Sequence, residues 1–279
     1  MRKTWKSIRF YFRVFQRLEL MNKAAGLSFY TAIAIFPLIM VLLAASQAFL
    51  KPEIVLQTLE RVFSAFLPYQ SDLLRTNLKS LYAQRHSVTV VGGLSLLVTG
   101  QMLYVNLERI MNSLLHVKMT RRFWQTRIWF FVWLSAMVTA LFAPLALDFL
   151  FVGLAQFGIR VPFIAKFANQ GAFLLLVFLM FVSAMIIVPT RRPRPGKLLF
   201  GAVMFTIATA IGKSVFRILT LKSFGRYDLV YGSLSTLVLV ALWVFYFYNI
   251  FLFCVYWVGR EHDPIYRESR LPVSQIKEG

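Results

Sequence analysis

Long apolar runs separated by short basic stretches dominate this chain. The clearest run extends from Leu229 to Gly259 and contains no Asp, Glu, Lys or Arg. About 20 apolar residues are enough for a helix to cross a bilayer, and this run is longer than that. Its Tyr and Trp side chains have the amphipathic rings that favour membrane interfaces or contacts between helices. The run therefore predicts a membrane-spanning helix.

Five further runs precede it, some of them interrupted by a few polar residues. Together they predict six transmembrane helices, at about residues 24–50, 88–115, 128–152, 168–188, 198–221 and 229–259. Three of these spans contain or end at a proline that breaks the helix hydrogen bonding, namely Pro37, Pro144 and Pro189. Broken helices line binding sites in many transporters, but proline is also common in membrane helices. The pattern predicts an all-α polytopic membrane protein.

The segments outside the spans are amphipathic or polar. On a helix over residues 1–23, four cations fall on one face and aromatic or aliphatic side chains on another, which is typical of a helix lying on the membrane surface. A simple signal that retains this end in the cytoplasm is the alternative. Residues 51–86 predict two short amphipathic helices outside the bilayer, on the extracytoplasmic side. Residues 262–279 form a short polar tail.

Composition and charge narrow the class of protein. Hydrophobic residues make up 58% and charged residues 15% of the 279 positions, against about 45–50% and 25% in soluble domains. The net charge of +20 fits either a nucleic-acid binder or a membrane protein with basic loops. Residues 1–23, 116–127 and 190–197 hold 15 of the 31 basic residues, whereas residues 153–167 hold two and the five in residues 51–86 are offset by acids. This distribution argues against a nucleic-acid face and places both termini in the cytoplasm.

Four groups of residues in order along the chain carry a resemblance to a known family. They are the stretch AAGLSFYTAIAIFP from Ala24 to Pro37; Asn112 followed by Arg121-Arg122-Phe123; Pro189 followed by Pro195-Gly196 and Tyr231-Gly232-Ser233; and Gly259-Arg260-Glu261. The chain resembles the YihY/BrkB family of bacterial inner-membrane proteins, once labelled ribonuclease BN. The resemblance implies six transmembrane helices in the inner membrane. It does not imply a settled activity.

Charged groups within the spans are the first candidates for a functional site, because they are costly in a bilayer and usually face protein or water. Lys213 and Arg217 lie one helical turn apart, on a face that also carries three threonines. They predict a site for an anion or a lipid headgroup between helices. Asp148 and Glu108 are the carboxylates available as counter-charge or proton site. The alternative is a structural ion pair, or cations that reach towards the membrane surface.

A second candidate cluster lies near the end of the second span. Glu108 and Asn112 are four residues apart and share a helix face. A proton- or cation-coupled transporter would need such a carboxylate in a cavity. Hydrogen bonding between helices is the structural alternative.

Signals for enzymatic chemistry are weak. The chain has no G-x-S-x-G, Walker A or H-E-x-x-H motif. His86, His116 and His262 are dispersed without metal-ligand spacing, and Cys254 is the single cysteine. We therefore expect no catalytic residues, no metal and no cofactor, and the ribonuclease label finds no support in the sequence.

Two functions remain after these exclusions. The first is a transporter or translocase of an anionic or lipid-like substrate. The second is a non-transporting membrane scaffold, active in envelope maintenance, that binds a partner through its surface helices. Both have the phospholipid bilayer and its anionic headgroups as partners, both allow a homo-oligomer, and neither requires nucleic acid.

Overall fold

The computed structural model describes residues 16–46, 85–118, 121–156, 162–231 and 235–262 of the chain. Within these ranges it contains six α-helices and a short 3-10 turn, and no strand: α2 (Leu20–Ser46), α5 (Arg85–Leu114), α6 (Phe123–Gln156), α7 (Pro162–Ile187), α8 (Pro195–Tyr231), α9 (Ser235–Gly259) and η2 (Arg260–His262). The prediction of an all-α chain is confirmed. Most of the predicted N-terminal surface helix, nearly all of the extracytoplasmic segment and residues 263–279 of the predicted tail lie outside the described residues.

Each of the six expected spans overlaps a helix, but the last one is divided, because α8 includes residues 229–231 and α9 begins only at Ser235. The polar residues 222–228 were expected to form a loop before the last span, whereas α8 continues through them to Tyr231. This stretch contains no proline, so nothing in it removes a helix hydrogen bond.

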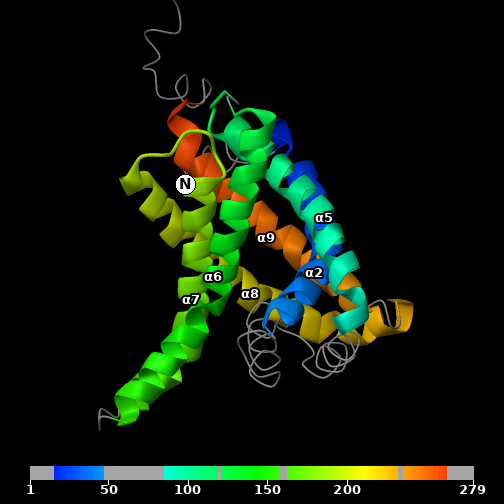
Figure 1. Cartoon of the computed structure of the whole chain (residues 1–279), viewed down its shortest axis with the longest axis vertical. Helices are drawn as coiled ribbons and strands as arrows, with labels where there is room; N and C mark the ends of the chain where they lie inside the picture. Colours follow the sequence, from blue (N-terminus) through cyan, green and yellow to red (C-terminus); the bar gives the residue numbers. More distant parts are fainter. Residues whose placement is uncertain (1–15, 47–84, 119–120, 157–161, 232–234, 263–279) are drawn as a thin grey trace, which may run out of the picture.

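The helices form a closed circuit of neighbours, in which α5 also contacts α6 and α9. α2 lies against α5 and α9, α9 lies against α8, α8 against α7, and α7 against α6. Figure 1 shows the α6–α7 pair on one side, α2 and α5 on the other, and α9 between them. The second half of α8 crosses the lower end of the molecule in this view.

The core is formed mainly by aromatic and large aliphatic side chains from several helices. Phe181 of α7 stacks on Phe205 of α8 with ring centroids 5.0 Å apart, and Phe251 of α9 meets both rings edge-on. Tyr104 of α5 meets Phe130 of α6 at 5.9 Å. Such pairs contribute roughly 0.5–1.5 kcal/mol beyond the area that they bury. The Tyr104–Phe130 pair joins α5 to α6, and the three phenylalanine rings join α7, α8 and α9.

Large apolar side chains also face outward, where a soluble protein would carry polar ones. On α8 they recur every three or four residues along one face: Leu199, Val203, Ile207, Ile211, Val215, Ile218 and Leu219. Contiguous exposed apolar surface of this kind marks contact with a membrane or a partner. Among the described helices, Pro195–Leu219 and Val238–Gly259 are long and apolar enough to cross a bilayer, with mean hydropathies of 1.7 and 2.3.

Two glycines allow α9 to approach its neighbours closely near its last turn. A Cβ atom on Gly259 would lie 2.8 Å from the carbonyl oxygen of Leu114 at the end of α5. A Cβ on Gly201 of α8 would lie 2.5 Å from Cγ2 of Val258. The contact at Gly259 is with backbone, which cannot move aside as a flexible side chain can. The ends of α5 and α9 can therefore approach this closely only because this residue has no side chain.

We predict that Gly259→Ala destabilises the protein by about 1–3 kcal/mol, the usual cost of overpacking a close contact. Gly26→Ala is the matched control, because a Cβ at Gly26 meets nothing within 4 Å and alanine suits a helix interior better than glycine. The thermal unfolding midpoints of the detergent-purified variants test this. Equal midpoints for the two variants would show that α9 has room to shift.

Candidate functional site

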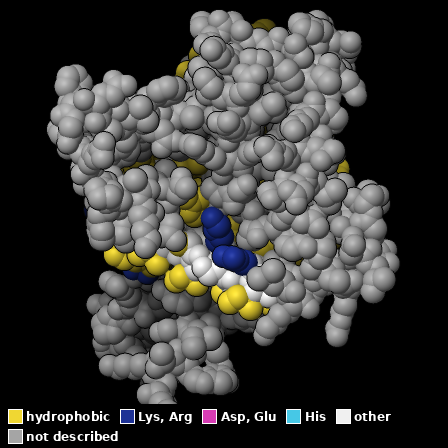
Figure 2. Space-filling view, turned by 90° about the horizontal axis from the view of Figure 1, so that it is seen from below, with side chains coloured by type: hydrophobic (Ala, Val, Ile, Leu, Met, Phe, Trp, Pro, Cys, Tyr) yellow, Lys and Arg dark blue, Asp and Glu magenta, His cyan; other side chains and the backbone are white. Residues whose placement is uncertain are grey.

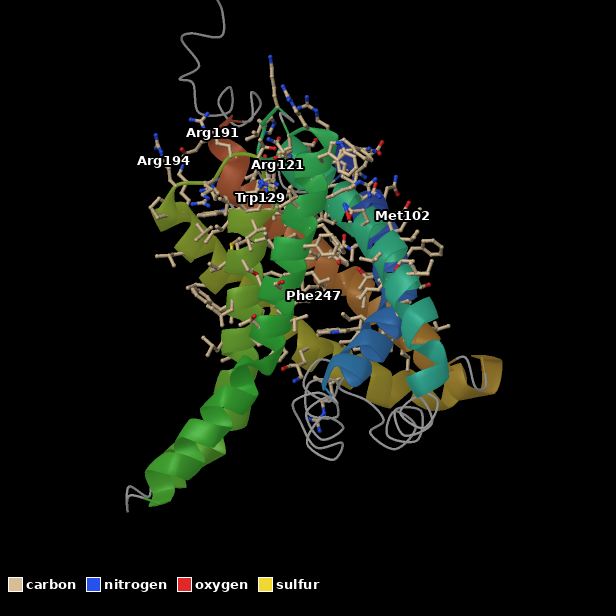
Figure 3. All side chains as sticks on the ribbon, in the orientation of Figure 1. Met102, Arg121, Trp129, Arg191, Arg194 and Phe247 are labelled. Atoms are coloured by element: carbon tan, nitrogen blue, oxygen red, sulfur yellow. The ribbon has the colours of Figure 1, made fainter. Side chains whose placement is uncertain are left out.

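A single arginine connects three parts of the fold at one end of the molecule. Arg121 lies just before α6, and its Nη1 donates to the hydroxyl of Tyr104, to Oε1 of Glu108 and to the carbonyl of Val188, at 3.2, 3.2 and 2.8 Å. Its Nη2 donates to the carbonyls of Ile187 and Pro189, at 3.0 and 2.9 Å. Figure 3 shows Arg121 at the same end as Arg191 and Arg194, and we call this the basic end.

The guanidinium group occupies a favourable electrostatic position. α7 ends at Ile187, and the last carbonyls of a helix carry partial negative charge and have no partner within the helix. Arg121 satisfies three carbonyls at this terminus and lies 4.8 Å from the centroid of the Trp129 ring. The planar fork of an arginine suits such a set of acceptors, and a lysine ammonium would not reach all of them.

Glu108 has a defined partner in this arrangement. Its carboxylate is fully buried and pairs with Arg121, whose side chain is 11% exposed. A buried carboxylate without a partner would be strongly destabilising, so this ion pair explains why an acid is tolerated inside α5. The structure thus places Glu108 in a contact that joins α5 to the start of α6, at the basic end.

Asn112, one turn further along α5, fixes the segment that follows α7. Its Oδ1 accepts from the backbone N–H of Thr190 at 2.9 Å, and its Nδ2 donates to Oγ1 of Thr190 at 3.1 Å. Asn112 is 1% exposed. Glu108, through Arg121, and Asn112 therefore hold the same turn at two successive points.

We predict that Asn112→Ala destabilises the protein by about 1–3 kcal/mol, because the N–H of the partly buried Thr190 loses its acceptor. Asn106→Ala is the control, since Asn106 donates only to the carbonyl of Met102 in its own helix. The control is expected to change stability by no more than about 0.5 kcal/mol. Thermal unfolding in detergent measures both, and a larger loss in the control would contradict the assignment.

Lys213 and Arg217 lie elsewhere, on the long helix α8. Lys213 is the midpoint of this helix, which runs from Pro195 to Tyr231, and it is half-buried. Its Nζ lies 4.2 Å from the centroid of the Phe173 ring of α7. Arg217, one turn further on, is exposed. Figure 2 views the molecule from the end opposite the basic end and shows Lys or Arg side chains beside hydrophobic ones.

Of the two carboxylates expected to partner these cations, the structure describes the side chain of Glu108 but not that of Asp148. Glu108 pairs with Arg121 instead. Asp148 falls within α6, but its side chain is outside the described residues, as is that of Pro144 in the same helix. Pro37 is buried inside α2, and Pro189 lies two residues after the end of α7. The structure thus brings Glu108 and Asn112 to one site and places Lys213 and Arg217 at another.

The sequence pattern did not indicate that Arg121 is the central residue of the basic end. Arg121 was assigned to a basic loop and to a family pattern, without a partner. The available signal was Glu108 itself, because a buried carboxylate in a span requires a cation and a basic loop follows the same span. Across the described ranges, no three His, Cys, Asp or Glu side chains come together as metal ligands would.

Comparison with known proteins places these features in a family. The family model described as Virulence factor BrkB matches residues 11–270. A UPF0761 membrane protein of Alteromonas mediterranea is 29% identical over 238 residues, covering 82% of this chain and 79% of the relative. A UPF0761 membrane protein of Haemophilus influenzae is 24% identical over 242 residues, covering 84% and 87%. No solved structure matches the chain.

Proposed function

Because this chain belongs to the virulence factor BrkB family of membrane proteins, we propose that it crosses the bacterial inner membrane six times and moves an anionic, lipid-like substrate past Lys213 and Arg217. In this proposal α8 supplies the cations that contact the substrate within the membrane. The basic end faces the cytoplasm, and both termini lie on that side. Each part of the proposal has separate support in the sequence and geometry.

The distribution of charge and aromatic rings supports this orientation. Basic residues are concentrated at the basic end, and cytoplasmic loops of membrane proteins carry an excess of Lys and Arg. Two cations there cover aromatic faces: Arg127 lies 4.1 Å from the Phe123 ring centroid, and Arg260 lies 4.1 Å from that of Trp257. Aromatic rings beside cations are typical of the level where lipid chains meet headgroups. The basic end then lies at a membrane surface.

The position of Lys213 is the observation that carries the proposal. A helix of 37 residues is about 55 Å long, well beyond the roughly 30 Å of a hydrocarbon core, so α8 must tilt or protrude. The stretch of α8 that is apolar enough to cross a bilayer runs from Pro195 to Leu219, and Lys213 lies six residues, about 9 Å, before its end. An ammonium group inside such a stretch is costly without a partner. Within the described part of the chain, Lys213 contacts the Phe173 ring and forms no ion pair or hydrogen bond. Arg217, one turn away, is another cation whose charge acts on Lys213, so an anion at Lys213 would offset this repulsion.

Buried polar atoms on several helices add to this support. Within the described ranges, the following side-chain atoms are buried and have no hydrogen-bond partner: Gln101 Nε2, Glu108 Oε2, Trp133 Nε1, Thr209 Oγ1 and Asn249 Oδ1. An unpaired buried polar group costs about 1–3 kcal/mol, so several together favour a polar ligand or water between the helices. Of these groups, Thr209 lies one turn before Lys213 on α8.

Lipid translocation in proteoliposomes tests the proposal. The purified protein is reconstituted with a trace of phosphatidylglycerol that carries a nitrobenzoxadiazole fluorophore, and dithionite then bleaches the probe in the outer leaflet. We expect faster inward-to-outward exchange with protein than in protein-free vesicles. The matched zwitterionic probe, phosphatidylcholine with the same fluorophore, should exchange more slowly. No acceleration for either probe would contradict translocation and favour the scaffold.

A further inference from the structure

A pocket with a volume of about 170 Å³ opens at the basic end, away from Lys213. Three segments form its wall: residues 115–117 after α5, residues 191–194 between α7 and α8 with Lys197 in the first turn of α8, and residues 258–259 at the end of α9. A water molecule in the liquid occupies roughly 30 Å³, so the pocket has room for a small oxyanion with its hydration. It is neither part of the Arg121 contacts nor near the cations at the middle of α8.

The wall of this pocket is strongly cationic. It contains Arg191, Arg192, Arg194 and Lys197. Lys197 pairs with Glu261, the residue after Arg260 in η2. The three arginines form no ion pair and no side-chain hydrogen bond with any part of the chain that the structure describes. Figure 3 shows Arg191 and Arg194 extending from this turn at the basic end.

The start of α8 adds to the positive potential. α8 begins at Pro195 and has no acidic residue in its first turn, and a helix N-terminus carries partial positive charge. Acids are favoured at this position and cations are disfavoured, yet here Arg194 precedes the helix and Lys197 lies in its first turn. The negative charge of an anion in the pocket would offset the repulsion between these cations and the positive end of the helix. Phosphates bind other helix N-termini in this way.

His116 completes the wall at the expense of backbone strain. Its φ is 55°, a left-handed conformation that favours glycine. The N–H of His116 bonds to Ser113 O and that of Val117 to Asn112 O, which is the Schellman pattern at the end of α5. Glycine would fit this position better, whereas histidine places an imidazole in the cationic wall.

We propose that this pocket binds a phosphate group, through arginine forks from residues 191–194 and the N-terminus of α8. Arg pairs with phosphate through two parallel hydrogen bonds, which gives geometric selectivity beyond simple charge. The group can come from a soluble phosphate or from an anionic lipid headgroup at the membrane surface. Binding here does not depend on whether the protein moves a substrate past Lys213.

Calorimetric titration of the detergent-purified protein tests the site with two probes. One is inorganic phosphate, and the other is short-chain dihexanoyl phosphatidic acid. The pocket variant is Arg191→Gln/Arg192→Gln/Arg194→Gln, and the control variant is Lys118→Gln/Arg122→Gln/Arg127→Gln, which removes the same charge at the same end. All six side chains lie at least partly at the surface, so we expect both variants to fold. Thermal unfolding without ligand checks that expectation. If a variant does not fold, the titration of the wild type still tests whether the protein binds either probe.

We expect at least about tenfold weaker binding to the pocket variant and little change in the control, since a hydrogen bond to a charged group is worth a factor of ten or more. Loss of both probes identifies the phosphate group itself as the ligand. Loss of phosphatidic acid alone assigns the pocket to lipid headgroups, and loss of phosphate alone assigns it to a soluble anion. Equal loss in both variants, or no binding of either probe to the wild type, overturns the proposal.

Discussion

Replacing Arg121 with alanine is expected to destabilise the protein by about 3–5 kcal/mol, the usual cost of removing one partner of a buried ion pair. The variant leaves the fully buried carboxylate of Glu108 without its cation. It also leaves the carbonyls of Ile187 and Val188 without this donor at the end of α7. For a chain of this size we expect the thermal midpoint to fall by on the order of 10 °C, measured by unfolding in detergent.

Two further variants separate the ion pair from the general effect of a lost charge. Arg122→Ala removes the neighbouring exposed arginine and is expected to change the midpoint little. Arg121→Met/Glu108→Gln removes both charges and should recover part of the loss, because no uncompensated buried charge remains. If Arg121→Ala unfolds at the temperature of Arg122→Ala, the contacts of Arg121 do not hold the α7 end in place.

The variant Lys213→Gln/Arg217→Gln is expected to slow phosphatidylglycerol exchange at least about tenfold, towards the rate of protein-free vesicles. Each lost hydrogen bond to a charged group costs roughly a factor of ten or more in binding. Stability should change much less, because the contact of Lys213 with the Phe173 ring contributes about 0.5–2 kcal/mol. Dithionite bleaching measures the exchange, and thermal unfolding of the same preparations measures the fold.

The control for this second prediction is Arg122→Gln/Arg127→Gln, which removes two charges at the basic end and should leave exchange unchanged. Lys213→Arg/Arg217→Lys keeps both charges and should retain most of the activity. Wild-type exchange in the Lys213→Gln/Arg217→Gln variant would remove these residues from the substrate path. Loss of exchange in the control variant as well would point to membrane surface charge rather than to a site.

The helices were largely predictable because bilayer length and apolar composition are local properties of the sequence. The end of α8 was not, since residues 222–231 are polar enough for a loop yet contain no proline. Hydropathy locates where a helix can leave the bilayer, but not whether it continues as a helix beyond that point. The close approach at Gly259 was also hidden, because a glycine shows no sign in the sequence of what it packs against.

For the candidate sites, the sequence showed which polar residues belong to a site more reliably than which residues they contact. It marked Glu108 and Asn112 as polar residues on one face of a span, and both lie in the contacts that hold the turn after α7. It did not identify Arg121 as the partner of Glu108, because that pairing depends on how the start of α6 meets α5 and the end of α7. Helix faces follow from spacing along one element, whereas contacts between helices depend on packing that spacing does not encode.

Native mass spectrometry of the detergent-purified wild type beside Lys213→Gln/Arg217→Gln tests most directly whether the cations of α8 hold an anion. It reports bound lipids and the oligomeric state of the protein together. We predict that the wild type retains an anionic lipid and that the variant loses it while keeping the same oligomeric state. An identical bound lipid in both proteins, or none in the wild type, would contradict an anion site at Lys213 and Arg217 and assign these residues a structural role.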